Sequence, residues 1–327
     1  MQKLNEELKS GQLKQVYLLY GEEDYLRRQY RDKLKEALMG GGDSMNCHYF
    51  EGKDIPVGEI IDLAETLPFL AERRVIVVEN SGLFKRGGEQ LAEYLKEPSD
   101  TAFFVFAEKE IDRRSKLFKS VSAKGRAVEF KSQDEAILKR WILGILKKEN
   151  KKITERDLEF FLDKTGTGME NISKELEKLV CYCMDKDVIT GADIENICTR
   201  QISNQIFDMM NAIAEKRQKE AMRLYYDLLT LKEPPMRILF LLARQFNLLL
   251  QVRELKKKGC PVKTIGEAVG LPGFVAGKYV SQAAKFSTKA LRQAVTDCVE
   301  AEEAVKTGKM NDVLSVELLL IRYSGAV

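Results

Sequence analysis

Residues 16–29 read VYLLYGEEDYLRRQ and contain the junction that decides the fold class. Five apolar or aromatic residues are followed by one glycine, three acidic residues and the start of an amphipathic segment. A short, continuous apolar run bounded by a turn is typical of a strand that is buried on both faces. The stretch therefore predicts a buried strand over Val16–Tyr20 that leads into a helix over 22–39.

The alternation of strand and helix continues through residues 1–131. The strand-like runs are rich in β-branched and aromatic residues and cover 16–20, 46–50, 75–78, 102–107 and 127–130. The segments between them have the mixed polar and apolar pattern of helices and cover 22–39, 57–66, 89–97 and 114–122. Strands that alternate with helices indicate βαβ units. We therefore expect a parallel sheet with helices on both faces.

From Ser132 onward the strand pattern disappears and the chain is helical in pattern. The first helical segments cover 135–148, 154–164, 171–183 and 191–198. Two of them begin with a threonine and an acidic residue three positions later, which is the form of a helix start. We predict an α/β plus all-α fold with three domains: a sheet domain over 1–131, a small helical domain over 132–205 and a helical C-terminal domain over 206–327.

One long apolar helix dominates the C-terminal domain. Pro234 and Pro235 precede it, and Gly259 and Pro261 end it, which predicts a helix over 236–258. Its apolar side chains include Leu239, Leu242, Phe246, Leu249 and Leu250. One face of such a helix serves the core of its own domain. The wide apolar spread leads us to expect additional surface for helices of neighbouring chains.

Composition limits the functional class. Apolar residues make up 44% of the 327 residues, which excludes an intrinsically disordered chain. The net charge is +3, but residues 201–327 hold 19 basic and 13 acidic side chains, an excess of +6. That excess favours a polyanion and is too small to identify DNA. The lysine runs at 147–152 and 256–258 are interpreted as solvated helix ends rather than as phosphate contacts.

Membrane and disulfide signals are weak. The six cysteines form no CxxC pair, and the first fifteen residues are polar and amphipathic, unlike a signal peptide. The most apolar window, 238–252, is interrupted by charged and amide side chains, so it is not expected to span a bilayer. These features predict a reduced, cytoplasmic location without a membrane partner.

The junction after the first strand argues against a nucleotide site. A phosphate-binding loop in this place would be rich in glycine and end in Lys-Ser or Lys-Thr. Gly21 is instead followed by Glu22, Glu23 and Asp24, which would repel a triphosphate. We interpret the three acids as favourable charges in the first turn of a helix. No cofactor and no nucleotide hydrolysis are expected.

Metal ligands and nucleophiles are also poorly represented. His48 is the one histidine in the sequence and lies in a predicted strand, where packing is its more common role. Cys181 and Cys183 are two residues apart, which directs them to different faces of a helix. Without histidine partners they cannot complete the usual tetrahedral zinc site. We predict no metal site and no catalytic residue.

The connection between the helix over 57–66 and the strand over 75–78 is unusually apolar. It reads Leu67-Pro68-Phe69-Leu70, whereas such connections are normally polar and exposed. Two interpretations are open. The side chains either fold back as a cap on the core or present a hydrophobic plug to the pocket of a partner, since aromatic anchors dominate interface energetics.

Several motifs, in order along nearly the whole chain, resemble one known family. They are VYLLYGEEDYLRRQ (16–29), ETLPFLAERRVIVVEN (65–80), GTGMENISKELEKL (166–179), EPPMRILFLLARQFNLLLQV (233–252), IGEAVGL (265–271), KFSTKALRQAV (285–295) and AVKTGKM (304–310). This set and its order resemble the delta subunit of the bacterial DNA polymerase III clamp loader. The resemblance implies an AAA+-like, ATPase-inactive sheet domain without a P-loop, a small helical lid-type domain and a C-terminal helical collar.

The family implies a role in DNA replication. Its members open the ring-shaped sliding clamp with a hydrophobic wedge, here Phe69 and Leu70 with Leu67 extending the apolar run. The implied partners are the beta clamp, the delta prime and tau/gamma loader subunits, and primer-template DNA, in the cytoplasm near the nucleoid. No intrinsic catalysis is implied, although the holoenzyme is a nucleotidyltransferase. The alternatives are a nucleotide-dependent enzyme with a divergent Rossmann-type site and a stand-alone DNA-binding protein.

Overall fold

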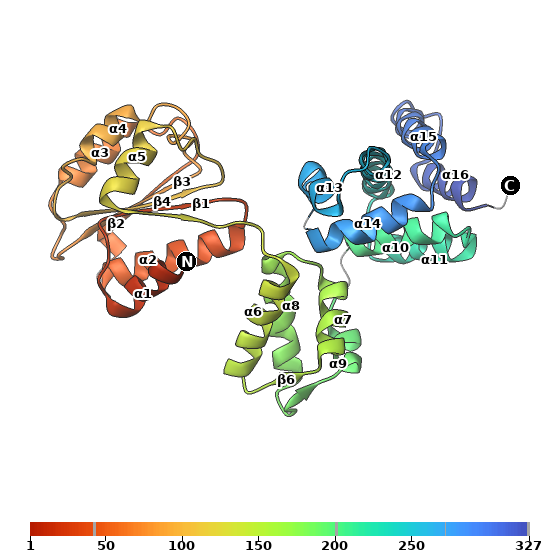
Figure 1. Ribbon diagram of the computed structural model, residues 1–327, viewed down its shortest axis with the longest axis horizontal. Helices are drawn as coiled ribbons and strands as arrows, with labels where there is room; N and C mark the ends of the chain where they lie inside the picture. Colours follow the sequence, from red (N-terminus) through yellow and green to blue (C-terminus); the bar gives the residue numbers. More distant parts are fainter. Residues whose placement is uncertain (42–43, 200–201, 272, 326–327) are drawn as a thin grey trace. The chain divides into compact units, whose positions relative to one another are not determined.

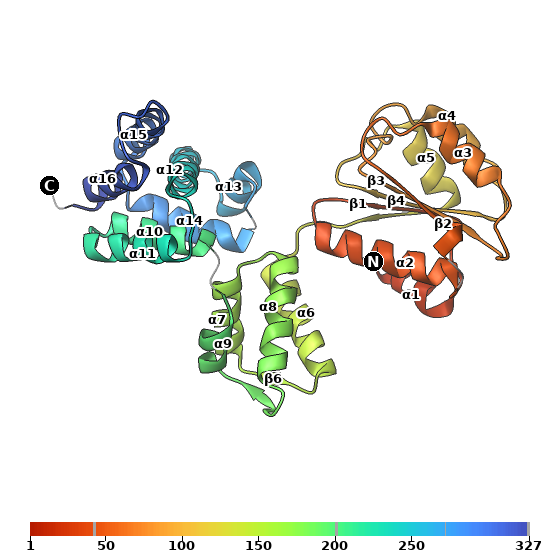
Figure 2. The ribbon, with the colours of Figure 1, turned by 180° about the vertical axis from the view of Figure 1, so that it is seen from behind.

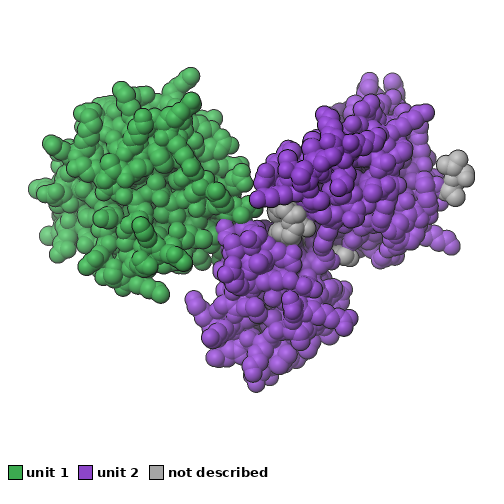
Figure 3. Space-filling view, in the orientation of Figure 1, with its two compact units in different colours: residues 1–132 green, residues 133–327 purple. Residues whose placement is uncertain are grey.

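A computed structural model of the chain describes residues 1–41, 44–199, 202–271 and 273–325. The chain divides into two compact units, residues 1–132 and 133–327 (Figure 3). Each unit has its own hydrophobic core and is described by itself below. The predicted division into three domains stays a prediction.

A five-stranded parallel sheet forms the centre of the first unit, with the strand order β2-β3-β4-β1-β5. The strands are β1 (Val16–Tyr20), β2 (Cys47–Glu51), β3 (Arg74–Glu79), β4 (Ala102–Glu108) and β5 (Arg126–Glu129). All five residues of β1 are buried between β4 and β5, which explains the uninterrupted apolar run VYLLY. The predicted strands lie within one residue of those observed.

Helices cover both faces of this sheet, as predicted (Figures 1 and 2). One face carries α1 (Gln2–Ser10) and α2 (Asp24–Met39). The other carries α3 (Val57–Glu65), α4 (Glu89–Tyr94) and α5 (Lys116–Lys124). The short 3-10 helix η1 (Ser44–Asn46) precedes β2. Phe84, Phe104 and Phe106 pack in the core on the α3, α4 and α5 side.

The second unit begins with a group of four helices. They are α6 (Glu135–Lys148), α7 (Glu155–Thr165), α8 (Met169–Tyr182) and α9 (Gly191–Ile197). Thr154 caps α7 and Thr190 forms a capping box with Asp193 at α9, so both predicted helix starts are confirmed. The prediction that no strand follows Ser132 is wrong, because β6 (Lys152–Ile153) and β7 (Val188–Ile189) pair in parallel. Two residues are too short for a periodic pattern.

In the described residues from 202 onward, seven further helices complete the second unit. They are α10 (Ile202–Ala214), α11 (Gln218–Thr230), α12 (Pro235–Lys257), α13 (Val262–Val269), α14 (Gly273–Ala284), α15 (Thr288–Lys306) and α16 (Asp312–Ser324). The long helix α12 packs against α10, α13, α14, α15 and α16. Together with the sheet of the first unit, these elements confirm the predicted mixed α/β plus all-α class. Among the described residues, no helix combines the length and apolar character needed to cross a bilayer.

The five apolar side chains predicted on α12 all serve the core of this unit. Leu239, Leu242, Phe246 and Leu249 are buried, and Leu250 is partly buried against the same cluster. Surface for a neighbouring chain therefore has to come from other residues. Exposed apolar side chains are present at Phe240 on α12 and on α16.

Candidate functional site

The apolar connection at residues 66–73 lies between α3 and β3, and its large side chains point into solvent. The exposed fractions are 77% for Leu67, 59% for Phe69 and 92% for Leu70. The interpretation in which they cap the core does not agree with this exposure. Three large apolar side chains on one short loop form the kind of exposed cluster that marks an interaction site. We call residues 66–73 the apolar loop.

Two buried polar side chains hold the apolar loop in place. Asn46 donates from Nδ2 to the Phe69 carbonyl (2.8 Å) and accepts at Oδ1 from the Phe69 amide (2.7 Å). Arg74 donates to the carbonyl oxygens of Thr66 (3.0 Å) and Leu67 (2.7 Å). Because Asn46 and Arg74 are themselves buried, these bonds lie in a medium of low dielectric constant and fix the loop backbone firmly.

Leu70 has an unusual backbone conformation. Its φ of 49° lies in the left-handed region, which costs a residue with a Cβ about 1–2 kcal/mol. Such conformations persist only where the surrounding structure imposes them, and they cluster at functional sites. The bonds from Asn46 and Arg74 on the preceding residues supply that restraint. The loop therefore presents its apolar tip in a preorganised form, which reduces the ordering cost of binding a partner.

His48 is part of the support of the apolar loop. Its Nε2 lies 2.8 Å from Nη1 of Arg74. Burial, and then the positive charge of Arg74, lower the pKa of His48 below its ordinary value of 6.5. The imidazole is therefore neutral at pH 7 and accepts the hydrogen bond from the guanidinium. The packing role predicted for His48 becomes a specific one, that of a neutral acceptor for the side chain that holds the loop.

We predict that the chain loses thermal stability as the pH falls below 6.5. The lowered pKa means that the fold favours neutral His48, so its contribution to stability is present above 6.5 and declines as protonation places a second cation beside Arg74. Melting temperatures at pH 7.5, 6.5 and 5.5 test this for the natural chain and for His48→Gln, whose amide oxygen can accept the same bond. A smaller decline is expected in the variant, and equal declines would contradict the role given to His48.

The junction after β1 is closed by contacts within the chain. Gly21 has a φ of 125°, and an added Cβ would lie 2.2 Å from the Phe130 carbonyl oxygen, so only glycine fits. Arg27 is buried and donates from Nη1 to the Gly21 carbonyl (2.6 Å) and from Nη2 to Asp24 (2.5 Å). The backbone and the cation at this junction are therefore already engaged. Asp24 lies in the first turn of α2 as predicted, whereas Glu23 is the N-cap residue and Glu22 precedes it.

Acidic side chains occupy the carboxyl ends of the neighbouring strands. Glu108 at the end of β4 is buried and accepts from the amide (2.9 Å) and hydroxyl (2.5 Å) of Ser81. Burial raises the pKa of Glu108. Glu79 at the end of β3 pairs with Arg31 of α2. Ligands of open α/β sheets bind at this edge, and here it carries carboxylates already bound to groups of the same chain.

We predict that the isolated chain does not bind ATP. The acidic residues 22–24 repel a triphosphate, and Arg27 and Arg31 already pair with carboxylates of the chain. Calorimetric titration with ATP and magnesium is expected to give no heat of binding at millimolar nucleotide. Binding in the micromolar range would overturn this prediction and would favour the Rossmann-type enzyme.

The cysteine side chains differ in exposure and in pKa. Cys181 is exposed and Cys183 is buried, in agreement with their predicted separation onto different faces. Burial raises the pKa of Cys198 to about 12, so its thiol stays protonated near neutral pH. In the described part of the chain, no group of three or more His, Cys, Asp or Glu side chains is placed to hold a metal ion.

Comparison with known proteins agrees with the order of motifs along the chain. The family model described as "DNA polymerase III, delta subunit" matches residues 17–131, and a second model, for the C-terminal domain of the same family, matches residues 203–323. The chain belongs to the DNA polymerase III delta subunit family. The first matched region of this delta-family chain corresponds to the predicted sheet domain, and the second corresponds to the predicted C-terminal helical domain.

Relatives of this delta-family chain extend over most of its length. DNA polymerase III subunit delta of Bacillus subtilis is 27% identical over 328 residues, which cover 96% of this chain and 94% of the relative. The probable delta subunit of Aquifex aeolicus is 24% identical, covering 78% and 75% of the two chains. Among solved structures, the Bacillus subtilis DNA clamp loader delta protein matches with a TM-score of 0.77 at 26% identity, covering 98% of both chains.

The sequence predicted the apolar loop of this delta-family chain but missed the side chains that support it. The structure brings Leu67, Phe69 and Leu70 together on one loop, as predicted from their adjacency. Asn46 lies 23 residues before Phe69, and no local pattern links the two. The one available signal was Arg74, a charged residue directly before the apolar run Val75–Val78 of β3.

Proposed function

We propose that this delta-family chain binds the ring-shaped sliding clamp and opens it during DNA replication. It would act as a subunit of a pentameric clamp loader in the bacterial cytoplasm. The observation that carries the proposal is the apolar loop, with Leu67, Phe69 and Leu70 exposed on a backbone held by Asn46 and Arg74. A firmly held apolar tip is suited to enter a hydrophobic pocket on a protein partner.

The free energy of burying the apolar loop is large enough to favour the open form of the clamp over the closed form. Burying one large apolar side chain contributes about 1.5–3 kcal/mol, so Phe69 and Leu70 together contribute about 3–6 kcal/mol. Shifting a clamp from 1% open to 99% open requires about 5.5 kcal/mol of preference for the open form. The pair reaches that value only at its upper limit, which favours Leu67 as a third contact.

The chain itself would supply no chemical energy. The closed junction at Gly21 and Arg27 and the engaged carboxylates at the sheet edge support a non-hydrolysing subunit. Binding of the clamp would then select its open form from an existing equilibrium. ATP bound to other loader subunits would govern when the apolar loop is exposed to the clamp.

Assembly into a loader would use the helical region 206–327 as a collar. Leu314, Leu318 and Ile321 of α16 lie at spacings of four and three residues and form one exposed apolar stripe. Tyr226 of α11 is also exposed and bonds to Glu317 of α16, which adds an aromatic side chain beside the stripe. A helix of a neighbouring subunit, delta prime or tau/gamma, is the partner that such a stripe fits.

Mixing the purified chain with its cognate clamp, without nucleotide, tests the proposal. Size-exclusion chromatography is expected to show one complex that contains both proteins. A chain that is folded by circular dichroism and elutes apart from the clamp at tens of micromolar would contradict the proposed function.

A further inference from the structure

One exposed face of α12 has a composition unlike the rest of the helix. Five of its residues recur at intervals of three and four, and a sixth follows seven residues later, just beyond the end of the helix: Arg237, Phe240, Arg244, Asn247, Gln251 and Lys258. All six are exposed, whereas the opposite face forms the core of the unit. We call this set the α12 stripe. It holds cations, amides and one aromatic ring.

The α12 stripe holds three cations, and the chain neutralises one of them, because Arg237 pairs with Glu233 (3.0 Å). The half-buried Glu254 near the end of the helix pairs with Arg292 of α15 (3.2 Å). Within the described residues, neither Arg244 nor Lys258 forms an ion pair with an acidic side chain. Part of the net charge excess of +6 in residues 201–327 therefore lies on this face of α12.

Phe240 is the decisive member of the stripe. It is 65% exposed, and arginines stand three residues before it and four residues after it on the same face. A phenyl ring alone on a polar face contributes nothing to the core of its own unit. Flanked by cations, it matches the combination by which proteins bind single strands: an aromatic platform for a base and positive charges for the phosphates.

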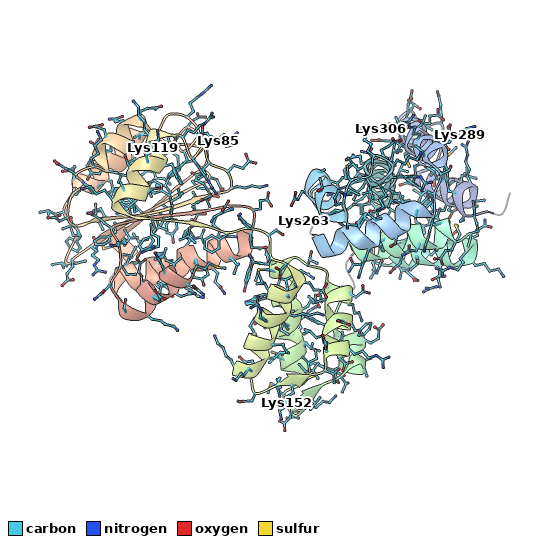
Figure 4. All side chains as sticks on the ribbon, viewed as in Figure 1. Lys85, Lys119, Lys152, Lys263, Lys289 and Lys306 are labelled. Atoms are coloured by element: carbon cyan, nitrogen blue, oxygen red, sulfur yellow. The ribbon has the colours of Figure 1, made fainter. Side chains whose placement is uncertain are left out.

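The positive surface continues past the end of α12. Lys257 donates to the Thr288 hydroxyl at the start of α15 (2.6 Å), which places the two helix ends in contact. Lys289 follows on α15 and is exposed (Figure 4). A phosphate backbone that follows the stripe would therefore meet further cations beyond its C-terminal end.

We propose that the α12 stripe binds single-stranded DNA, with Phe240 stacking on a base and Arg244 contacting a phosphate. The ring requires an unpaired base, because a duplex encloses the faces of its bases. The inference extends the proposed function, since it rests on membership of a clamp loader and adds a DNA-contacting surface to it. A protein partner would be expected to meet more apolar area than one phenyl ring among amides and cations.

Fluorescence anisotropy of the full chain with a fluorescein-labelled oligo-dT of twenty nucleotides tests the stripe. Phe240→Ala is expected to weaken binding about 5- to 100-fold, the range for removal of one stacking side chain. Arg244→Gln is expected to weaken binding and to lower the slope of log affinity against log salt by about 0.7, the value for one phosphate contact on a single strand. Both side chains are exposed, so neither change is expected to disturb folding.

Matched controls separate this inference from the proposed function. Leu231→Ala removes an exposed apolar side chain elsewhere in the unit, and Lys306→Gln removes an exposed lysine that pairs with Glu302 on α15 (Figure 4). Both controls are expected to bind DNA like the natural chain, and all four variants are expected to bind the clamp. Unchanged DNA binding by Phe240→Ala and Arg244→Gln, no DNA binding by the natural chain at low salt, or loss confined to loader assembly would each overturn the proposal.

Discussion

Replacing Phe69 and Leu70 together by alanine is expected to abolish clamp binding and to leave the melting temperature nearly unchanged. The two side chains are mostly exposed, so little core packing is lost in the free chain. In the complex, their loss removes about 3–6 kcal/mol of apolar burial, which lowers affinity by a factor of about 100 to 10,000. Isothermal titration calorimetry with the clamp and a thermal melt of the free chain measure the two quantities.

Two companion variants sharpen this result. Leu231→Ala with Val299→Ala removes two exposed apolar side chains of the second unit and is expected to leave clamp binding intact. Asn46→Ala removes both side-chain bonds to Phe69 while keeping the apolar side chains, and is expected to weaken clamp binding less than the double change. Natural affinity in the Phe69 and Leu70 double variant would contradict the assignment, and a loss of several degrees in its melting temperature would restore the core-cap interpretation.

Placing glutamate at both Leu314 and Leu318 is expected to prevent assembly with the other loader subunits while clamp binding continues. Both side chains lie on the exposed stripe of α16, so the free chain tolerates the charges. An apolar contact with a neighbouring helix does not, because it would bury two carboxylates without partners. Co-expression with the loader subunits, followed by size-exclusion chromatography, measures the composition of the assembly.

Leu143→Glu is the control for the collar variant. Leu143 is exposed to a similar degree on α6, outside the predicted collar. The Leu143→Glu variant is expected to assemble into the loader as the natural chain does. A loader of full composition that contains the Leu314 and Leu318 variant would remove the α16 stripe from the interface, and it would leave the assignment of the apolar loop intact.

The fold class could be predicted because its signals are local. Val16–Tyr20 is apolar at every position, as a parallel strand covered on both faces must be, and Thr190 with Asp193 starts α9 through contacts only three residues apart. The pairing of β6 with β7 could not be predicted, because two-residue strands have no period. Sequence reasoning also could not separate the buried Leu239 from the exposed Phe240, which are neighbours on a helix that packs against five others.

The sequence predicted the apolar run of the functional site but not the contacts that hold it. The apolar run around Phe69 is visible in the sequence because connections of this kind are normally polar. Its exposure is decided by distant residues: Asn46 and Arg74 fix the backbone, and His48 stays neutral beside Arg74. The junction at Gly21 shows the same limit. Its acidic residues are apparent in the sequence, whereas the contact of Arg27 with the Gly21 carbonyl is a product of the fold.

Opening of the clamp, as distinct from binding to it, is the central claim, and release of the clamp from circular DNA, which has no ends, measures it most directly. The clamp is first loaded onto nicked circular DNA and separated from free protein. The chain is then added without ATP or other loader subunits, and clamp remaining on the circle is followed by gel filtration. We predict that the natural chain releases the clamp and that the Phe69 and Leu70 double variant does not. A chain that binds the clamp tightly and leaves it on the circle would contradict the account.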